Sequence, residues 1–359
     1  MMKIGMLTSG GDCQALNAAM RGVVKGLTTN VDELEIYGFE NGYKGLIYEQ
    51  YRILTASDFS GILTRGGTIL GSSRQPFKQM RVPDENGLDK VEAMKSTYRK
   101  LGLDCLVILG GNGTQKTANL LREEGLNIIH LPKTIDNDIY GTDVTFGFQS
   151  AINIATETID CIHTTAASHN RVFIVEVMGH KVGWVTLHAG IAGGADIILI
   201  PEIPYKMESI INAISKRTQE GKHFTIIAVA EGAISQEEAL LTKKKLKELR
   251  ASEAGKYPSV AYKIGDKITE LCGHEVRVTV PGHVQRGGQP NAYDRVLATR
   301  LGVKAAELIM AGKYGYMPCV KNNQIDIIPI SEVAGKTRKV DPQSDVVLQA
   351  RQLGLCLGD

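Results

Sequence analysis

The stretch LPKTIDNDIYGTD, residues 131–143, contains more charged and polar side chains than a simple turn requires. Asp136, Asp138 and Asp143 lie within eight residues, with Asn137 between the first two and Lys133 just before them. Carboxylates at this spacing can ligate Mg²⁺, and a further carboxylate can accept a proton as a general base. Phosphoryl transfer needs these groups, because its catalysis consists mostly of positioning and charge neutralisation.

Two glycine-rich segments add a second part of that chemistry. TSGGD (8–12) and LGGNGTQKT (109–117) each follow an apolar run and lead into a helical pattern. Glycine lets backbone N–H groups approach an anion, and a helix N-terminus adds positive potential. Either segment alone could be an ordinary tight turn, but both together with the acidic stretch predict a site for a phosphoryl donor.

Basic residues at other strand–loop junctions favour an anionic substrate. Arg171 precedes one apolar run, Arg277 lies in another, and His283 and Arg286 stand beside a glycine pair in PGHVQRGGQP. A single arginine is more often part of a surface ion pair, and His283 alone could be structural. Three arginines and a histidine in such positions favour a sugar phosphate bound by bidentate contacts.

The elements that must position these residues alternate along the chain. Short apolar runs typical of strands buried on both faces occur at KIGMLT, CLVILG, NIIHLP, RVFIVEVM, ADIILIP, FTIIAVAE and EVRVTV. Helical patterns lie between them, at 15–27, 116–124, 148–163, 208–220 and 291–310. This alternation predicts an α/β fold with parallel sheets, which bind ligands at the carboxyl ends of their strands.

Composition limits the function classes. The chain has 359 residues, 43% hydrophobic and 22% charged, with a net charge of only +2, so nothing favours nucleic acid or a membrane as partner. No long apolar segment and no leader are visible, so we expect a cytoplasmic protein with free cysteines.

One ordered set of segments is very specific: LTSGGDCQALNAAMRG, GTILGSSR, GGNGT, PKTIDNDIYGTD, SHNRVFIVEVMG, AGIAGGAD and GHVQRGG. This set resembles the 6-phosphofructokinase family over essentially the whole chain. The resemblance implies phosphorylation of fructose 6-phosphate at its 1-hydroxyl by MgATP, in glycolysis. It also implies two Rossmann-like lobes with mainly parallel sheets sandwiched by helices, an active site in the cleft between them, and a homotetramer or dimer whose subunits share that site. We expect residues 1–146 with about 285–335 to form the larger, donor-binding lobe, and 147–284 with about 336–359 the smaller, sugar-phosphate lobe.

The resemblance also assigns roles to individual residues. Asp136 matches the catalytic base, Thr134 contacts the reacting groups, and Asp138 holds the Mg²⁺ network together with Asn112. The nucleotide-site positions are Gly11, Tyr43, Arg74, Gln75, Gly111, Asn112, Gly113 and Thr114. The fructose 6-phosphate positions are Thr134, Ile135, Asp136, Met178, Gly179, His180, Glu231, His283 and Arg286, with Arg171 and Arg277 reaching the sugar phosphate from a neighbouring subunit.

Three departures from the family pattern leave alternatives open. Asn112 replaces the usual metal-site aspartate, and His180 replaces the usual arginine, which would suit a catalytically weakened paralogue that binds sugar phosphate. Lys133 replaces a glycine, as in a branch that mixes ATP-dependent and pyrophosphate-dependent members. Pyrophosphate-dependent members also carry an aspartate at the position of Gly113; because this chain does not, we expect ATP as the donor, with pyrophosphate as the alternative. NAD and lipid kinases share a GGDGT-like loop but lack the other motifs.

Overall fold

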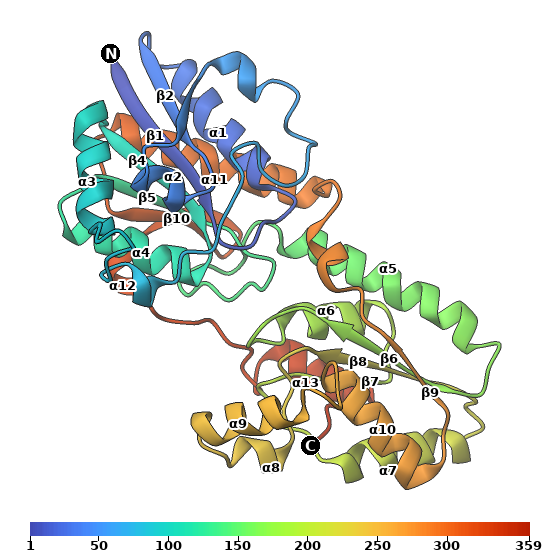
Figure 1. The fold of residues 1–359 in the computed structure, drawn as a ribbon. Coiled ribbons are helices and arrows are strands. Elements are labelled where there is room, and N and C mark those ends of the chain that lie inside the picture. The colour runs from blue at the N-terminus through green and yellow to red at the C-terminus, as the bar shows by residue number, and fades with distance from the viewer. The chain divides into compact units, whose positions relative to one another are not determined.

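The computed structural model describes all residues, 1–359, and divides into two compact units. Unit 1 comprises Met1–Ser150 and Arg286–Arg338, and unit 2 comprises Ala151–Gln285 and Lys339–Asp359. The chain passes from one unit to the other three times: within helix α5 (Phe148–Ala166), within the 3₁₀ helix η3 (Gly282–Arg286), and between Arg338 and Lys339 (Figure 1). None of the helices combines the length and the apolar character needed to cross a lipid bilayer.

Unit 1 is built on a seven-stranded sheet with the order β11-β10-β5-β4-β1-β2-β3. The inner pairs are parallel, and the edge strands β3 and β11 are antiparallel to their neighbours. β4 and β5 are buried along their whole length, as expected for strands covered on both faces. The strands are β1 (Met2–Ser9), β2 (Leu34–Phe39), β3 (Tyr51–Leu54), β4 (Cys105–Gly110), β5 (Ile128–Pro132), β10 (Tyr316–Lys321) and β11 (Gln324–Pro329).

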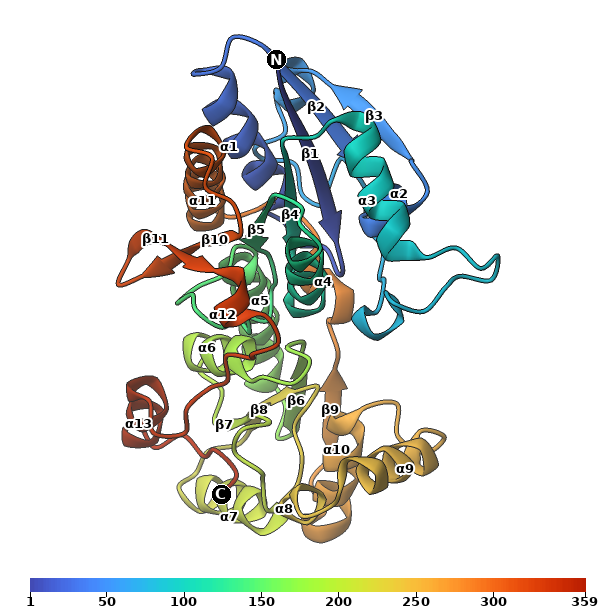
Figure 2. The same ribbon diagram turned by 90° about the vertical axis from the view of Figure 1, so that its left-hand side faces the viewer.

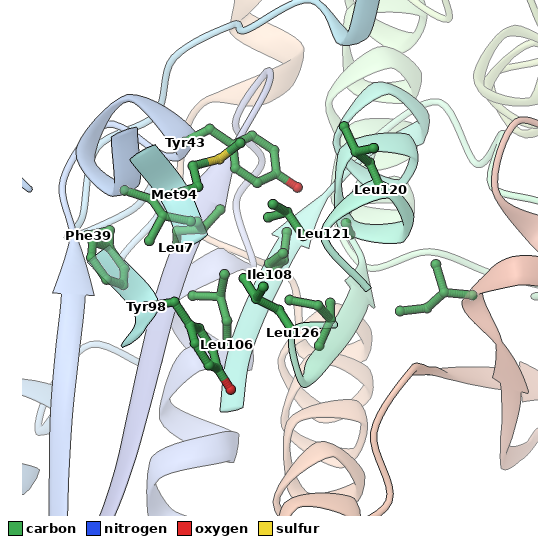
Figure 3. Close-up of a cluster of buried hydrophobic side chains, with 14 of the residues drawn as sticks. Leu7, Phe39, Tyr43, Met94, Tyr98, Leu106, Ile108, Leu120, Leu121 and Leu126 are labelled. Carbon is green, nitrogen blue, oxygen red and sulfur yellow. The ribbon is translucent and has the colours of Figure 1, made fainter. Parts of the chain in front are cut away.

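Helices cover both faces of this sheet (Figure 2). On one face α1 (Leu16–Thr28) packs against α11 (Ala292–Met310). The other face carries the main apolar cluster of the unit, which joins side chains of β1, β2 and β4 to those of the covering helices (Figure 3). These helices are α2 (Tyr43–Ile47), α3 (Lys90–Leu101), α4 (Asn112–Glu123) and α12 (Ile330–Val333); the 3₁₀ helices η1 (Ala56–Phe59) and η2 (Phe77–Gln79) lie in the connections.

Unit 2 contains a smaller parallel sheet with the order β7-β8-β6-β9. Helices α7 and α10 pack on one face and form an apolar cluster with the strands, while α6 contacts β7 and β8. The strands are β6 (Val172–Val177), β7 (Ile197–Leu199), β8 (Thr225–Ala230) and β9 (Val276–Thr279). The helices are α6 (Trp184–Ala192), α7 (Met207–Gln219), α8 (Gln236–Ala239), α9 (Lys243–Glu253), α10 (Val260–Cys272) and α13 (Asp345–Gln352).

The predicted α/β class with mainly parallel sheets is confirmed. Each of the apolar runs predicted as strands contains one, namely β1, β4, β5, β6, β7, β8 and β9. The predicted helices correspond to α1, α4, α5, α7 and α11, with α4 beginning at Asn112 rather than at residue 116. Four strands, β2, β3, β10 and β11, were not predicted from the apolar pattern.

Candidate functional site

The loops that follow β1 and β4 lie side by side, because these strands are parallel neighbours whose last residues, Ser9 and Gly110, are paired. The Thr114 hydroxyl donates to the Ser9 carbonyl at 3.2 Å and ties the two loops together. Helix α4 begins directly after Gly111, so its unbonded first-turn N–H groups and the positive end of its dipole lie at the same edge. The two glycine-rich segments therefore meet at one edge of one sheet.

A third segment, residues 71–75, packs against the first of these loops. The Gly10 N–H donates to the Ser73 carbonyl at 3.1 Å, and the Ser72 hydroxyl donates to the Gly10 carbonyl at 2.5 Å. Arg74 and Gln75 follow directly, and the Arg74 side chain is exposed. The segment thus brings the exposed Arg74 next to the first glycine-rich loop.

Internal hydrogen bonds fix the acidic loop after β5. The Thr134 hydroxyl accepts from the Asp136 N–H at 3.0 Å, and the Thr134 carbonyl accepts from the Thr145 hydroxyl at 2.8 Å. Asn137 is buried with a positive φ of 54°, and its side-chain oxygen accepts from the Thr145 N–H at 3.0 Å. Asn137 therefore anchors the turn, and Asp136 beside it remains partly exposed.

Asn112 and Asp138 form one polar pair. The Asn112 Nδ2 donates to the Asp138 Oδ2 at 2.6 Å and to the Asp138 carbonyl at 3.1 Å. Burial raises the pKa of the Asp138 carboxyl, and the hydrogen bond from Asn112 opposes this shift. The Asn112 side-chain oxygen is buried and has no hydrogen-bond partner. The chain contains no group of three or more His, Cys, Asp or Glu side chains that could hold a metal ion. A metal at this place would therefore need ligands from outside the protein in addition to Asn112 and Asp138.

Asp143, the third aspartate of the stretch, has a structural role. Its N–H donates to the Val320 carbonyl at 2.9 Å, and its carboxylate accepts from the Asn322 N–H at 2.8 Å. These partners belong to the hairpin of β10 and β11, so Asp143 fixes that hairpin instead of joining Asp138 at a metal site.

Lys133 and Arg286 both contact the first glycine-rich loop. The Lys133 ammonium donates to the Gly11 carbonyl, and the Arg286 Nη1 donates to the Asp12 carbonyl at 2.9 Å. Lys133 is almost fully buried, and this burial lowers the pKa of its ammonium group, with a further lowering from the nearby Arg286. The lysine thus touches the protein's own backbone.

In unit 2, a second polar group lies where parallel strands β6 and β8 end. Met178, Gly179 and His180 follow β6, and Glu231 follows β8. The Glu231 carboxylate accepts from the His180 N–H at 2.7 Å and from the Gly179 N–H at 3.4 Å. His180 has a positive φ of 52° and an exposed side chain. Four of the predicted sugar-phosphate residues are therefore brought together at this edge.

Arg171 and Arg277 lie at the opposite edge of that sheet. Arg171 precedes β6, and Arg277 is paired with Phe173 near the start of the same strand. Both arginines donate to Glu275, Arg171 through Nε at 2.6 Å and Arg277 through Nη2. These contacts hold the pKa of the Glu275 carboxyl below its usual value. Because β6 spans 6 residues, about 20 Å of strand separates these arginines from Met178.

Exposure separates the remaining predicted residues into two groups. The side chains of Tyr43 and Ile135 are buried, and the Tyr43 hydroxyl donates to the Thr114 carbonyl at 2.8 Å. Any contact that Ile135 makes with a substrate must therefore come from its backbone. Gly113 and His283 are exposed, and a β-carbon added at Gly113 would meet nothing within 4 Å.

Two supporting residues were missed at the sequence level. Asn17 is fully buried in α1, and its side chain accepts from the Ile69 N–H at 2.9 Å and donates to the Arg65 carbonyl at 2.9 Å, which fixes the chain ahead of Arg74. A polar residue on the apolar face of a predicted helix is the signal that could have found it. Glu275 was missed because one of its two partners, Arg171, lies 104 residues earlier in the chain.

The chain matches known proteins over its whole length. A family model described as Phosphofructokinase matches residues 3–309. An "ATP-dependent 6-phosphofructokinase" of Spirochaeta thermophila is 54% identical over 99% of this chain and 97% of its own, and "ATP-dependent 6-phosphofructokinase 3" of Bacteroides thetaiotaomicron is 45% identical over 99% and 100%. Among solved structures, Pichia pastoris phosphofructokinase in the T-state is similar with a TM-score of 0.78 and 32% identity, over 93% of this chain but only 35% of that longer one.

Proposed function

This chain belongs to the phosphofructokinase family, and we propose that it is an ATP-dependent 6-phosphofructokinase. It transfers the terminal phosphoryl group of ATP to the 1-hydroxyl of fructose 6-phosphate and yields fructose 1,6-bisphosphate and ADP. The observation that carries this proposal is the meeting of the loops after β1, β4 and β5 at one sheet edge, with Asp136 partly exposed there. The names of the full-length relatives support ATP as the donor.

Asp136 acts as the general base in this proposal. Its carboxylate takes the proton of the 1-hydroxyl while that oxygen attacks the terminal phosphorus, and the bond from phosphorus to the ADP oxygen breaks. The hydrogen bond from the Asp136 N–H to the Thr134 hydroxyl fixes the backbone from which this carboxylate extends. Thr134 lies beside it and contacts the transferred group. The donor phosphates bind N–H groups of the first loop and of the first turn of α4, through Gly11, Gly111, Gly113 and Thr114.

Asn112 and Asp138 would hold Mg²⁺, and the donor phosphates and water would supply its other ligands. The unpartnered, buried oxygen of Asn112 beside the Asp138 carboxylate fits such an ion. When bound, Mg²⁺ neutralises charge on the donor phosphates. Without the ion, the Asn112 amide donates a hydrogen bond to the Asp138 carboxylate, which a second carboxylate could not do.

In this proposal fructose 6-phosphate contacts Met178, Gly179, His180, Glu231 and His283. The hydrogen bonds that the Glu231 carboxylate accepts from two backbone N–H groups orient it, and its remaining lone pairs are suited to sugar hydroxyls. Only one nitrogen of Arg286 is engaged by Asp12, so the rest of its guanidinium group is available to an anion.

We further propose a homo-oligomer, a tetramer or a dimer, in which Arg171 and Arg277 serve the sugar phosphate of a neighbouring subunit. Their location at the strand-start edge of the sheet, about 20 Å of strand from Met178, supports this arrangement, because they cannot reach that edge within their own sheet. An enzyme of glycolysis with this activity is expected in the cytoplasm.

The test is direct formation of the product. Purified protein is incubated with fructose 6-phosphate and MgATP carrying a labelled terminal phosphate, and label is expected in fructose 1,6-bisphosphate in equal amount to the ADP formed. Binding of fructose 6-phosphate without any transfer would contradict the proposal and would identify a non-catalytic paralogue.

A further inference from the structure

Two cationic side chains bind consecutive carbonyl groups of the first loop. Lys133 donates to the carbonyl of Gly11, and Arg286 donates to that of Asp12. Burial and the nearby Arg286 lower the pKa of the Lys133 ammonium, and the carboxylates of Asp136 and Asp12 oppose this shift. The contacts that define the position of the two cations are therefore the hydrogen bonds to the two loop carbonyls.

The contacts also determine which way the loop's N–H groups point. In a planar trans peptide the C=O of one residue and the N–H of the next point in opposite directions. When the carbonyls of Gly11 and Asp12 turn toward the two cations, the N–H groups of Asp12 and Cys13 turn away from them. Neither of these N–H groups donates a hydrogen bond within the chain. Consecutive N–H groups that are not paired within the chain are available to bind an anion.

The identity of Gly11 is explained by the same contact. A β-carbon built on Gly11 would lie 2.5 Å from Nη1 and 2.9 Å from Cζ of Arg286. Any larger residue would displace the guanidinium group from the loop. Gly11 therefore allows the arginine to lie against the backbone, and Gly10 before it has a positive φ of 86°, which also favours glycine.

We propose that Lys133 and Arg286 are positioning residues that turn the first loop so that the N–H groups of Asp12 and Cys13 face the phosphates of the donor. This rests on the proposed function for the identity of the anion. Lys133 then acts on the donor through the backbone of the loop, without touching the terminal phosphates. Its presence is compatible with either donor, because the N–H groups that it orients bind any phosphate oxygen.

Lys133→Met is the informative change, because Arg286 is also assigned to the sugar phosphate. The variant keeps the buried volume and removes the donor group, so we expect kcat/KM for ATP to fall by roughly 10- to 100-fold. Lys133→Gln, which keeps a shorter neutral donor, should lose less, and it carries the test if Lys133→Met does not fold. Lys244→Met removes an exposed lysine of α9 and is the matched control, with unchanged kinetics.

Hydrogen–deuterium exchange of the peptide that covers residues 9–15 separates an indirect role from a direct one. At a saturating concentration of a non-hydrolysable ATP analogue, the wild type should show protection of this peptide, and Lys133→Met should show much less. Full protection in Lys133→Met at saturation, with only the affinity reduced, would mean that Lys133 contacts the donor directly and would overturn the inference. Unchanged affinity and protection would overturn it as well. If the wild type binds the analogue but never phosphorylates fructose 6-phosphate, the proposed function fails while this readout remains valid.

Discussion

Gly113→Asp should abolish the use of ATP without damaging the fold. Gly113 lies in the first turn of α4, is exposed, has no positive φ, and has open space where a β-carbon would stand. An aspartate there is compatible with the ligand-free protein. Because glycine is a poor helix former and a carboxylate favours a helix N-terminus, the free energy of unfolding should rise by about 0.3–1 kcal/mol.

The substitution should instead weaken the interaction with the nucleotide, whose α-phosphate is expected beside residue 113. Two unit charges about 4 Å apart repel each other by about 4 kcal/mol at the effective dielectric constant of a protein surface. This energy corresponds to a fall of about 10³-fold in kcat/KM for ATP. The assay couples fructose 1,6-bisphosphate to NADH oxidation at saturating fructose 6-phosphate, and Gly113→Asn is the neutral control of nearly the same shape. A folded Gly113→Asp protein that keeps kcat/KM for ATP within about threefold of the wild type would refute this reasoning.

Three further predictions concern the other parts of the site. Asp136→Ser should lower kcat by about 10²- to 10⁴-fold with little change in KM for fructose 6-phosphate, and a near-normal kcat would sink the assignment of the base. Burial raises the pKa of Asp138, so its charged form lowers the free energy of unfolding at a pH above the raised pKa. Ligand-free Asp138→Asn should therefore melt at a higher temperature than the wild type at pH 7, and the difference should vanish as the pH falls through that pKa toward 3.8. Equal melting temperatures at pH 7 would contradict this prediction. Arg171→Ala and Asp136→Ser should each be weakly active alone but regain activity when co-expressed, since a mixed oligomer contains sites with both native residues; no recovery in isolated mixed oligomers would argue against a shared site.

The sequence predicted the strands that are buried on both faces, because continuous Ile, Val and Leu runs carry that signal. It missed β10 and β11 for a physical reason. β11 lies at the sheet edge and contains no buried residue, and β10 contains Pro318, which lacks an N–H. Pro318 is tolerated because β10 pairs with β5 at a single position, Tyr316 with Ile129.

At the site, the sequence predicted which loops carry polar chemistry but not which side chains support others. Asp143 looked like a third carboxylate of a metal site, yet its partner Asn322 belongs to a hairpin 179 residues further along the chain. Asn137 looked like a spacer, yet it anchors the turn. Lys133 stood out in the sequence as a replacement for a glycine, and only the structure gives its contact with Gly11. Such partnerships depend on tertiary contacts, which local patterns do not encode.

The most direct test of the account compares the two phosphoryl donors with the wild-type protein. Formation of fructose 1,6-bisphosphate is measured at saturating fructose 6-phosphate and Mg²⁺ while ATP and pyrophosphate are each varied. Because Gly113 leaves room for a nucleotide and Lys133 is engaged by the loop, we expect kcat/KM for ATP to exceed that for pyrophosphate by at least about tenfold, or 1.4 kcal/mol. A much higher kcat/KM for pyrophosphate would mean that Lys133 determines the donor, and it would contradict the assignment of ATP.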